Sequence, residues 1–411
     1  MENNKTPSIR FKGFTDPWEQ RKLGDQMYIK SRIGWQALTK KEYLETGDYY
    51  LITGTDIDED KHIVDFNCCY YVSKERYEMD DKIQVYEGDI IVTKDGTIGK
   101  VAMVTGLDKP ATLNSHLFVL RDLSGKLYNR FLLQVLVSHI FGDFVESTKT
   151  GSTLTGLPQK TFVEFRFLMP EMDEQMKIAQ YLDNLDNLIT LHQRKYNKLL
   201  NVKKSMLEKM FPKNGSNIPE IRFKEFTDPW EQRKLGDIIT EYKETVDSDC
   251  TLPILTSSKT EGVILQEEHF GRKQQHDITG YNILPRNYCT YRNRSDGVDF
   301  TFNINKCCDK GIISKFYPVF SGKNSDVFFL SLVLNNSEEV VREIAYTCTG
   351  TGQKVLSFLD LQKMKVRVPN FDEQKEIAAY FDSFDHLITL HQRELEKLQN
   401  IKKSMLEKMF V

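Results

Sequence analysis

The strongest constraint on the fold of this chain is that its sequence is duplicated. Residues 9–25 read IRFKGFTDPWEQRKLGD, and residues 221–237 repeat this lead 212 positions later with one difference, Gly13 against Glu225. A second pair of segments, 173–211 and 372–410, lies 199 positions apart and is identical at 27 of 39 positions. A repeat of about half the chain excludes a short-period solenoid and predicts two copies of one larger unit.

Two bodies lie between these constant segments, residues 26–171 and 238–371, and they look unrelated over most of their length. Each combines short strand-like runs with one helix-like stretch, residues 127–147 in the first body and 326–345 in the second. The sequence therefore predicts two α+β bodies in a constant frame. A cluster of turn-forming residues at 212–217 marks the boundary between the copies.

The constant segments are predicted to form long coiled-coil helices. Apolar residues recur at alternating steps of four and three along both segments, as in a heptad seam. Acidic starts and lysine-rich ends suit the helix dipole. We expect the two helices to pack antiparallel, related by a pseudo-twofold; the alternative is that each packs only on its own body. The predicted interhelix seam comprises Ile178, Leu182, Leu185, Ile189, His192 and Leu199 in one helix and Ile377, Phe381, Phe384, Ile388, His391 and Leu398 in the other.

These signals together predict five segments along the chain. They are a first domain with its lead at 1–172, a central helix at 173–211, a linker at 212–220, a second domain at 221–371 and a C-terminal helix at 372–411. At about 1.5 Å per residue, each helix would be roughly 58 Å long.

Composition and motifs argue against an enzyme. The net charge is −3, with 56 basic and 59 acidic residues, so any contact with nucleic acid must come from local features. The sequence contains no HExxH, GxSxG or CxxC motif, and no catalytic or metal-binding residue is predicted. Asp16-Pro17-Trp18 and Asp228-Pro229-Trp230 faintly resemble the base-holding loop of amino-methyltransferases, but we expect the Trp to anchor the chain and the Pro to force a turn. The seven cysteines, the polar N-terminus and the lack of a long apolar run predict a cytoplasmic protein with reduced thiols.

Several loops rich in Gly, Ser, Thr, Asn and Lys are the candidate DNA-binding sites. Backbone amides and cations in such loops suit phosphate contacts, and Arg, Asn and Gln suit base edges. Each loop taken alone is more typical of an ordinary solvated turn. The recurrence of Thr-Gly at 150–151 and 349–350 in otherwise divergent bodies favours a functional role. The first body offers Lys94, Thr97, Lys100, Asn114, Ser115, His116, Lys149, Ser152 and Thr153, and the second offers Arg292, Asn293, Arg294, Ser295, Ser314, Lys315, Thr349, Thr351, Gln353 and Lys354.

Three features of the chain occur together: the doubled FTDPWEQRKLGD lead, the doubled DEQ-start segment with ITLHQR and KKSMLEKMF, and the unlike bodies between them. In these features the chain resembles the specificity subunit of type I restriction-modification enzymes, in particular its staphylococcal-type members. The resemblance spans the whole chain. It implies that each body is a target recognition domain that reads one half of a split double-stranded DNA site. It also implies that the helices set the unread spacer and dock two methyltransferase (modification) subunits, which two restriction/translocase subunits join for cleavage.

The resemblance further implies a non-catalytic subunit of a phage-defence complex that combines a restriction endonuclease with an adenine-N6 methyltransferase. No cofactor is expected in this chain, while S-adenosylmethionine, ATP and Mg are implied for the partner subunits. The main alternative from the sequence is a non-catalytic coiled-coil adaptor whose bodies bind proteins. A self-contained methyltransferase or nuclease is a third hypothesis, against which the absence of cofactor and carboxylate motifs argues.

Overall fold

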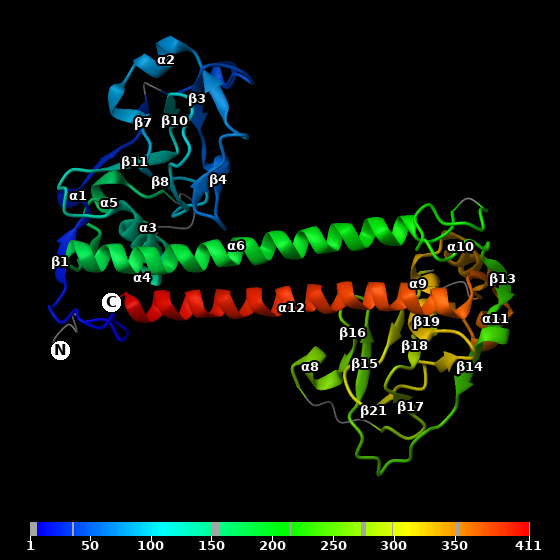
Figure 1. Cartoon of the computed structure of the whole chain (residues 1–411). Helices are drawn as coiled ribbons and strands as arrows, with labels where there is room; N and C mark the ends of the chain where they lie inside the picture. Colours follow the sequence, from blue (N-terminus) through cyan, green and yellow to red (C-terminus); the bar gives the residue numbers. More distant parts are fainter. Residues whose placement is uncertain are drawn as a thin grey trace. The chain divides into compact units, whose positions relative to one another are not determined.

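The computed structural model describes residues 6–34, 37–148, 156–213, 215–272, 277–297, 299–349 and 353–410. It separates into two compact units, which we call unit 1 (Met1–Lys195 with His391–Val411) and unit 2 (Tyr196–Leu390). Each unit contains one α+β body and part of two long helices, α6 (Met172–Lys209) and α12 (Phe371–Met409), as Figure 1 shows. The predicted class, two α+β bodies joined by two long helices in an internally repeated chain, is confirmed.

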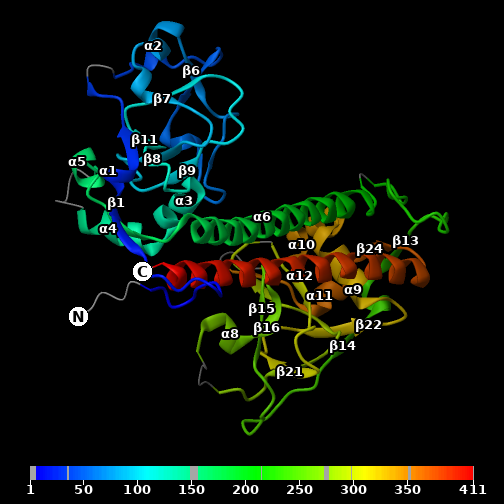
Figure 2. The same cartoon turned by 60° about the vertical axis from the view of Figure 1, so that its left-hand side comes forward.

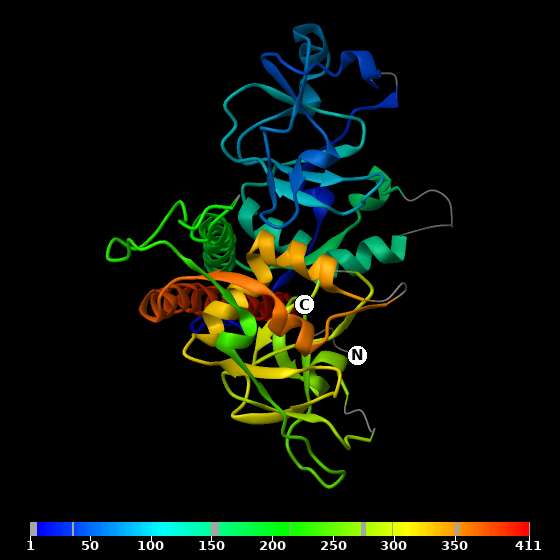
Figure 3. The same cartoon turned by 90° about the vertical axis from the view of Figure 1, so that its right-hand side faces the viewer.

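The body of unit 1 is built on a six-stranded sheet with the order β2-β11-β8-β9-β5-β4. A second sheet has the order β6-β3-β10-β7, and the strand β1 pairs with β12. In Figure 3 most of these strands, coloured blue to cyan, lie above the teal helices of the same unit. The strands are β1 Glu19–Lys22, β2 Met27–Lys30, β3 Tyr49–Ile52, β4 Ile57–Asp58, β5 Ile63–Val64, β6 Tyr70–Val72, β7 Gln84–Val85, β8 Ile90–Thr93, β9 Val101–Met103, β10 Ala111–Leu113, β11 Leu117–Asp122 and β12 Arg166–Met169. The helices are α1 Leu23–Gln26, α2 Lys74–Glu78, α3 Asn129–Val137, α4 His139–Thr148 and α5 Gln159–Phe162, with single 3-10 turns at Lys40–Glu42, Gly54–Asp56 and Asp81–Ile83.

The body of unit 2 is built on a four-stranded sheet with the order β14-β22-β18-β20. Four two-stranded sheets accompany it, namely β13-β24, β15-β16, β17-β21 and β19-β23. The strands are β13 Glu231–Lys234, β14 Ile239–Tyr242, β15 Leu255–Ser258, β16 Gly262–Leu265, β17 Asn282–Pro285, β18 Cys289–Tyr291, β19 Arg294–Ser295, β20 Phe302–Ile304, β21 Lys310–Ile313, β22 Val319–Gly322, β23 Lys354–Val355 and β24 Lys365–Val368. The helices are α7 Leu235–Ile238, α8 Gln266–Phe270, α9 Val327–Asn336, α10 Glu338–Thr347 and α11 Phe358–Lys363.

The two bodies share one topology although their sequences have diverged. The order β2-β11-β8-β9 in unit 1 matches β14-β22-β18-β20 in unit 2, and all three contacts are antiparallel in both. A strand pair formed by the lead, β1 with β12, likewise matches β13 with β24. The duplication therefore extends through the bodies and is not limited to the constant segments.

Each body was expected to carry one long helix, and this expectation is wrong. Residues 127–147 form α3 and α4, which are separated at Ser138, and residues 326–345 form α9 and α10, which are separated at Ser337. Both serines have extended backbones, and the Ser337 hydroxyl accepts a hydrogen bond from the amide of Val340 and so begins a new helix. The residue pattern at 297–302 also predicts a strand, and this prediction is misplaced, because β20 begins only at Phe302.

The constant lead is held to the start of each long helix by a buried ion pair. In unit 1, Arg10 donates from Nε and Nη2 to the two carboxylate oxygens of Glu174 at 2.7 and 2.8 Å, and Trp18 donates from its indole nitrogen to Glu174 at 3.2 Å. Glu174 and Trp18 are each only 1% exposed. The same contacts recur in unit 2 among Arg222, Glu373 and Trp230. The Trp of each DPW motif is therefore a structural anchor, as expected.

Within each unit the two long helices run antiparallel. In unit 1, Asp186 of α6 pairs with Lys402 of α12 at 2.6 Å, and His192 lies 3.1 Å from His391 between their Nδ1 atoms, so rising numbers in one helix meet falling numbers in the other. In unit 2, Lys203 pairs with Asp385. Lys203 and Lys402 occupy heptad-seam positions between apolar residues, and each thus pairs with an aspartate of the other helix. Burial and the neighbouring His192 and Lys195 lower the pKa of His391, which favours the neutral imidazole.

The seam residues contribute both to packing of helix on helix and to packing of the helices on the body, the two arrangements considered for the heptad pattern. Ile178, Leu182, Leu185, Ile377 and Phe381 are buried, while Ile189, His192, Leu199, Phe384, Ile388, His391 and Leu398 are half-buried. The first turns of α6 pack into the core of their own body, and the end of α12 packs on the same core through Leu398, Met409 and Phe410. Figure 2 shows the C-terminal end of α12 beside the lead, where the amide of Ile9 donates to Lys408 O at 3.1 Å.

Candidate nucleic-acid interface

Three loops meet at one end of the central sheet of unit 1. The loop after β8 begins at Lys94, whose amide donates to His116 O in the loop before β11 at 2.9 Å. The carbonyl of Lys94 accepts from the amide of Leu157 at 2.7 Å, and Asp95 forms an isolated bridge with Gly156. Leu157 follows the KTGST motif, whose residues 149–153 lie outside the described part of the chain. The structure thus brings together two of the predicted loops and the segment that follows the third.

Three loops of unit 2 meet in the same way. The amide of Asn293 donates to Phe316 O at 2.9 Å, and the carbonyl of Asn293 accepts from the amide of Leu356 at 3.0 Å. Arg294 in β19 pairs with Val355 in β23, and Thr349 exchanges two backbone hydrogen bonds with Val355. These bonds show which positions of the two units are equivalent. Lys94 corresponds to Asn293, His116 to Phe316 and Leu157 to Leu356. Two bodies of unlike sequence therefore build one backbone framework for three loops.

The predicted residues of unit 1 differ in how free their side chains are. Lys94 is half-buried, with Nζ 3.3 Å from Ser31 Oγ, and Lys100 forms an ion pair with Glu59. Asn114 is 5% exposed, and its Oδ1 accepts from the amide of His116 at 3.0 Å, so it shapes the loop. Thr97 and His116 are exposed and Ser115 is half-buried, whereas Lys149, Ser152 and Thr153 lie outside the described residues.

Among the predicted residues that the structure describes, unit 2 has more exposed Lys and Arg side chains than unit 1. Arg292, Arg294, Lys315, Thr349 and Gln353 are exposed. Half-buried positions are Asn293, Ser295, Ser314 and Lys354, and Thr351 lies outside the described residues. The guanidinium carbon of Arg294 lies 4.4 Å from the ring centroid of Phe316, within the range of a cation–π contact. This arrangement holds one arginine in place while it remains open to solvent.

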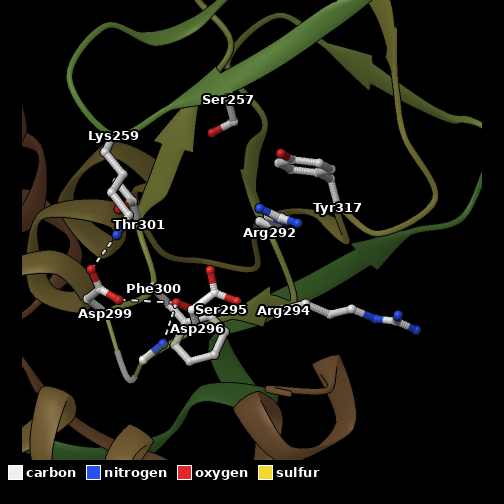
Figure 4. Close-up of a pocket in the computed structure, with 11 residues that line it drawn as sticks. Ser257, Lys259, Arg292, Arg294, Ser295, Asp296, Asp299, Phe300, Thr301 and Tyr317 are labelled. Atoms are coloured by element: carbon white, nitrogen blue, oxygen red, sulfur yellow. Dashed lines mark hydrogen bonds and ion pairs between the residues drawn. The ribbon is translucent and has the colours of Figure 1, made fainter. Parts of the chain in front are cut away.

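A hollow of about 380 Å³ lies beside these loops in unit 2. Its lining residues are Ser257, Lys259, Arg292, Arg294, Ser295, Asp296, Gly297, Asp299, Phe300, Thr301 and Tyr317. Figure 4 shows Arg292 beside the Tyr317 ring and Arg294 pointing away from the other labelled side chains. Burial raises the pKa of Tyr317, and the charge of Arg292 opposes this shift. Hydroxyls and cations on one surface suit a nucleic-acid backbone.

Not every cation of the hollow is available to a ligand. Lys259 forms an ion pair with Asp299, and Asp299 also accepts a hydrogen bond from Ser295 Oγ at 3.1 Å. Lys259 and Phe316 were not predicted as site residues. Phe316 directly follows the predicted Ser314 and Lys315, so the polar loop that contains them could have pointed to it. Lys259 lies in the turn between β15 and β16, where no loop was predicted to bind DNA.

Two features are absent from the described residues. None of their helices is both long and apolar enough to cross a membrane. In the same part of the chain, no three His, Cys, Asp or Glu side chains come together as metal ligands would.

Comparisons with known proteins identify the family. The type I restriction modification DNA specificity domain matches residues 15–201 and again residues 227–400. Two specificity subunits of type I restriction enzymes from Methanocaldococcus jannaschii align over nearly the whole length. The putative MjaX subunit is 25% identical and covers 95% of this chain and 92% of its own, and the MjaVIII subunit is 23% identical and covers 95% and 91%.

Solved structures agree at the level of the fold. The S subunit of a type I restriction-modification system from M. genitalium aligns with a TM-score of 0.58 at 15% identity and covers 99% of both chains. The finer likeness to staphylococcal members stays a prediction. Because the matched domain covers both halves of the repeat, the chain belongs to the family of type I restriction modification DNA specificity proteins.

Proposed function

We propose that this chain is the DNA-recognition subunit of a type I restriction-modification complex in which each unit reads one half of a bipartite site. The observation that carries the proposal is the three-loop framework, which is repeated in both units but presents different side chains. One frame with two unlike sets of reading residues suits a split target whose halves differ. The described residues proposed to face DNA are Lys94, Thr97, Lys100, Ser115 and His116 in unit 1 and Arg292, Asn293, Arg294, Ser295, Ser314, Lys315, Thr349, Gln353 and Lys354 in unit 2.

In this proposal catalysis belongs to partner subunits. Two methyltransferase subunits and two restriction/translocase subunits would assemble with one copy of this chain. S-adenosylmethionine, ATP and Mg²⁺ would be bound by those partners. This chain would contribute the target sequence and the distance between its two halves.

The function is tested by selection from a random duplex library in a gel-shift experiment with the purified methyltransferase partner. We expect the retained duplexes to share two short motifs that are separated by a fixed number of unread base pairs. Mobility that is the same for all sequences would contradict the proposal and favour the protein-binding adaptor. Salt should be held constant, because phosphate contacts make affinity strongly salt-dependent.

Repeated exposed leucines supply a candidate docking surface for the methyltransferase subunits. In α6, Leu188 and Leu191 are 43% and 45% exposed, and in α12 the equivalent Leu387 and Leu390 are 41% and 45% exposed. Both pairs lie in the repeated LITLHQR sequence. Exposed apolar residues kept identical in two copies suit one partner that binds twice.

Replacing Leu188 and Leu191 with glutamate should reduce the number of methyltransferase subunits bound per chain from two to one, because a charge would be buried in one of two equivalent contacts. Native mass spectrometry of the assembled complex measures this number. Leu200→Glu is the matched control, since Leu200 is 39% exposed on the same helix but its repeat counterpart is Gln399. Two bound subunits in the double variant, or loss of one in the control, would contradict the assignment.

A further inference from the structure

One pair of side chains connects the first two loops in each unit, and the two pairs occupy equivalent positions. In unit 1, Asp95 directly follows Lys94, and its Oδ2 lies 3.4 Å from Nδ1 of His116. In unit 2, Arg294 directly follows Asn293, and its guanidinium lies 4.4 Å from the Phe316 ring. The pair Asp95–His116 is thus replaced in unit 2 by Arg294–Phe316.

Equivalent backbone contacts hold these positions in both units. Asp95 forms a bridge with Gly156, and Arg294 pairs with Val355, so the third loop closes on the same residue in both units. The neighbouring amides and carbonyls carry the equivalent hydrogen bonds described above. Since the side chains of Asp95 and Arg294 take no part in these backbone bonds, the residue at position 95 or 294 can change without loss of the local fold.

The four side chains of these pairs are open to solvent to different extents, but all reach the surface. In unit 1 the side chains of Asp95 and His116 are 43% and 60% exposed. In unit 2, Arg294 is exposed and Phe316 is 37% exposed. The Arg294 side chain contacts the Phe316 ring and pairs with no carboxylate of the described residues, whereas the nearby Lys259 forms an ion pair with Asp299. The donors of Arg294 therefore remain available.

The two positions carry opposite hydrogen-bonding chemistry. A guanidinium donates only, and its fork matches the O6 and N7 acceptors of guanine in the major groove. An ionised carboxylate accepts only and matches the N4 amino group of cytosine. A carboxylate also repels phosphates, so an exposed aspartate at a DNA-facing loop lowers affinity unless it reads a base.

We propose that the residue at position 95 in unit 1 and at the equivalent position 294 in unit 2 determines specificity in the half-site of its unit. Arg294 reads a guanine in the half-site of unit 2, and Asp95 reads a cytosine in that of unit 1. Phe316 and His116 act as positioning residues that hold the reading side chain across the gap between two loops. The inference rests on the proposed function and deepens it by assigning one base to one residue in each unit.

The test is selection of random duplexes by the complete complex of this chain with its methyltransferase partner, carried out for wild type, Arg294→Ala and Asp95→Ala. Arg294→Ala should reduce the preference for guanine at one position of one half-site by roughly 5- to 150-fold, the range for loss of a bidentate base contact. The other half-site and the spacer should stay unchanged. Asp95→Ala should affect one cytosine in the other half-site only.

Two additional variants separate reading from positioning. Phe316→Leu removes the aromatic face but keeps an apolar side chain, and it should weaken the preference for the same guanine without changing any other base. Lys243→Ala, at an exposed lysine that pairs with Glu241 outside the three loops, should leave both half-sites unchanged. The unaffected half-site in each variant reports that the complex is folded and assembled.

The outcomes distinguish failure of this inference from failure of the proposed function. If Arg294→Ala weakens binding equally to all sequences and leaves the motif intact, Arg294 contacts phosphate and the inference is overturned, while a bipartite wild-type motif still supports the function. If Asp95→Ala leaves the cytosine preference unchanged, its half of the inference fails. If the wild-type complex selects no motif, the proposed function itself fails.

Discussion

Replacing Glu174 with alanine should lower the free energy of unfolding of unit 1 by about 3 to 5 kcal/mol, the usual cost of removing one partner from a buried ion pair. Glu174 is 1% exposed and accepts from both Arg10 and Trp18. Its loss would leave a guanidinium whose side chain is only 12% exposed without its carboxylate. The hydrogen bond to Glu174 raises the pKa of Arg10, and the variant loses this contribution. An arginine nevertheless stays protonated near neutral pH, so the cation would persist in the variant.

Chemical denaturation combined with hydrogen exchange at the β1 amides measures this loss. Glu373→Ala should produce the same loss in unit 2, because Glu373 pairs with Arg222 in the same geometry. Glu171→Ala, an exposed residue three positions before Glu174, is the control and should change stability by no more than about 0.5 kcal/mol. A loss below about 1 kcal/mol in both Glu→Ala variants would show that the lead is not held by these pairs.

Removing one heptad from each long helix should shorten the unread spacer of the DNA site by about three base pairs. Seven residues contribute about 10 Å of helix rise, and successive base pairs lie about 3.4 Å apart. Deleting residues 195–201 and 394–400 keeps the phase of the seam and removes neither docking leucine pair. The half-site sequences should stay unchanged, because the loops of both bodies are untouched.

Selection of random duplexes by the assembled complex measures the spacer of this variant. Deleting residues 195–201 alone is the control, since it shortens only one helix of the pair. This control should lose sequence-specific binding, because the remaining helix cannot keep its seam in register. Altered half-site bases with an unchanged spacer in the double deletion would contradict the role of the helices as a ruler.

The frame of the molecule could be predicted from the sequence because duplication made it visible. The heptad pattern predicted α6 and α12 to within a residue or two at most ends, and the seam lysines turned out to pair with Asp186 and Asp385. The breaks at Ser138 and Ser337 could not be predicted, since apolar residues at helical spacing continue on both sides of each serine. There the local backbone and its capping bonds override the pattern.

The candidate site could be predicted only in part. Composition located the loops, but the equivalence of Lys94 with Asn293 and of His116 with Phe316 depends on backbone hydrogen bonds, which leave no trace in side-chain identity. Asn114 matched the expected chemistry yet is buried. Phe316 was not predicted, because the loops were identified by their polar and charged residues, whereas the structure places this aromatic ring beside Arg294.

Recognition of a split DNA site by this chain is tested most directly by methylome sequencing of cells that express it together with its methyltransferase partner, compared with cells that express the partner alone. We expect N6-methyladenine in one split motif with two unlike halves and a fixed unread spacer, present only when this chain is expressed. A single continuous motif, or a methylation pattern that does not depend on this chain, would contradict it.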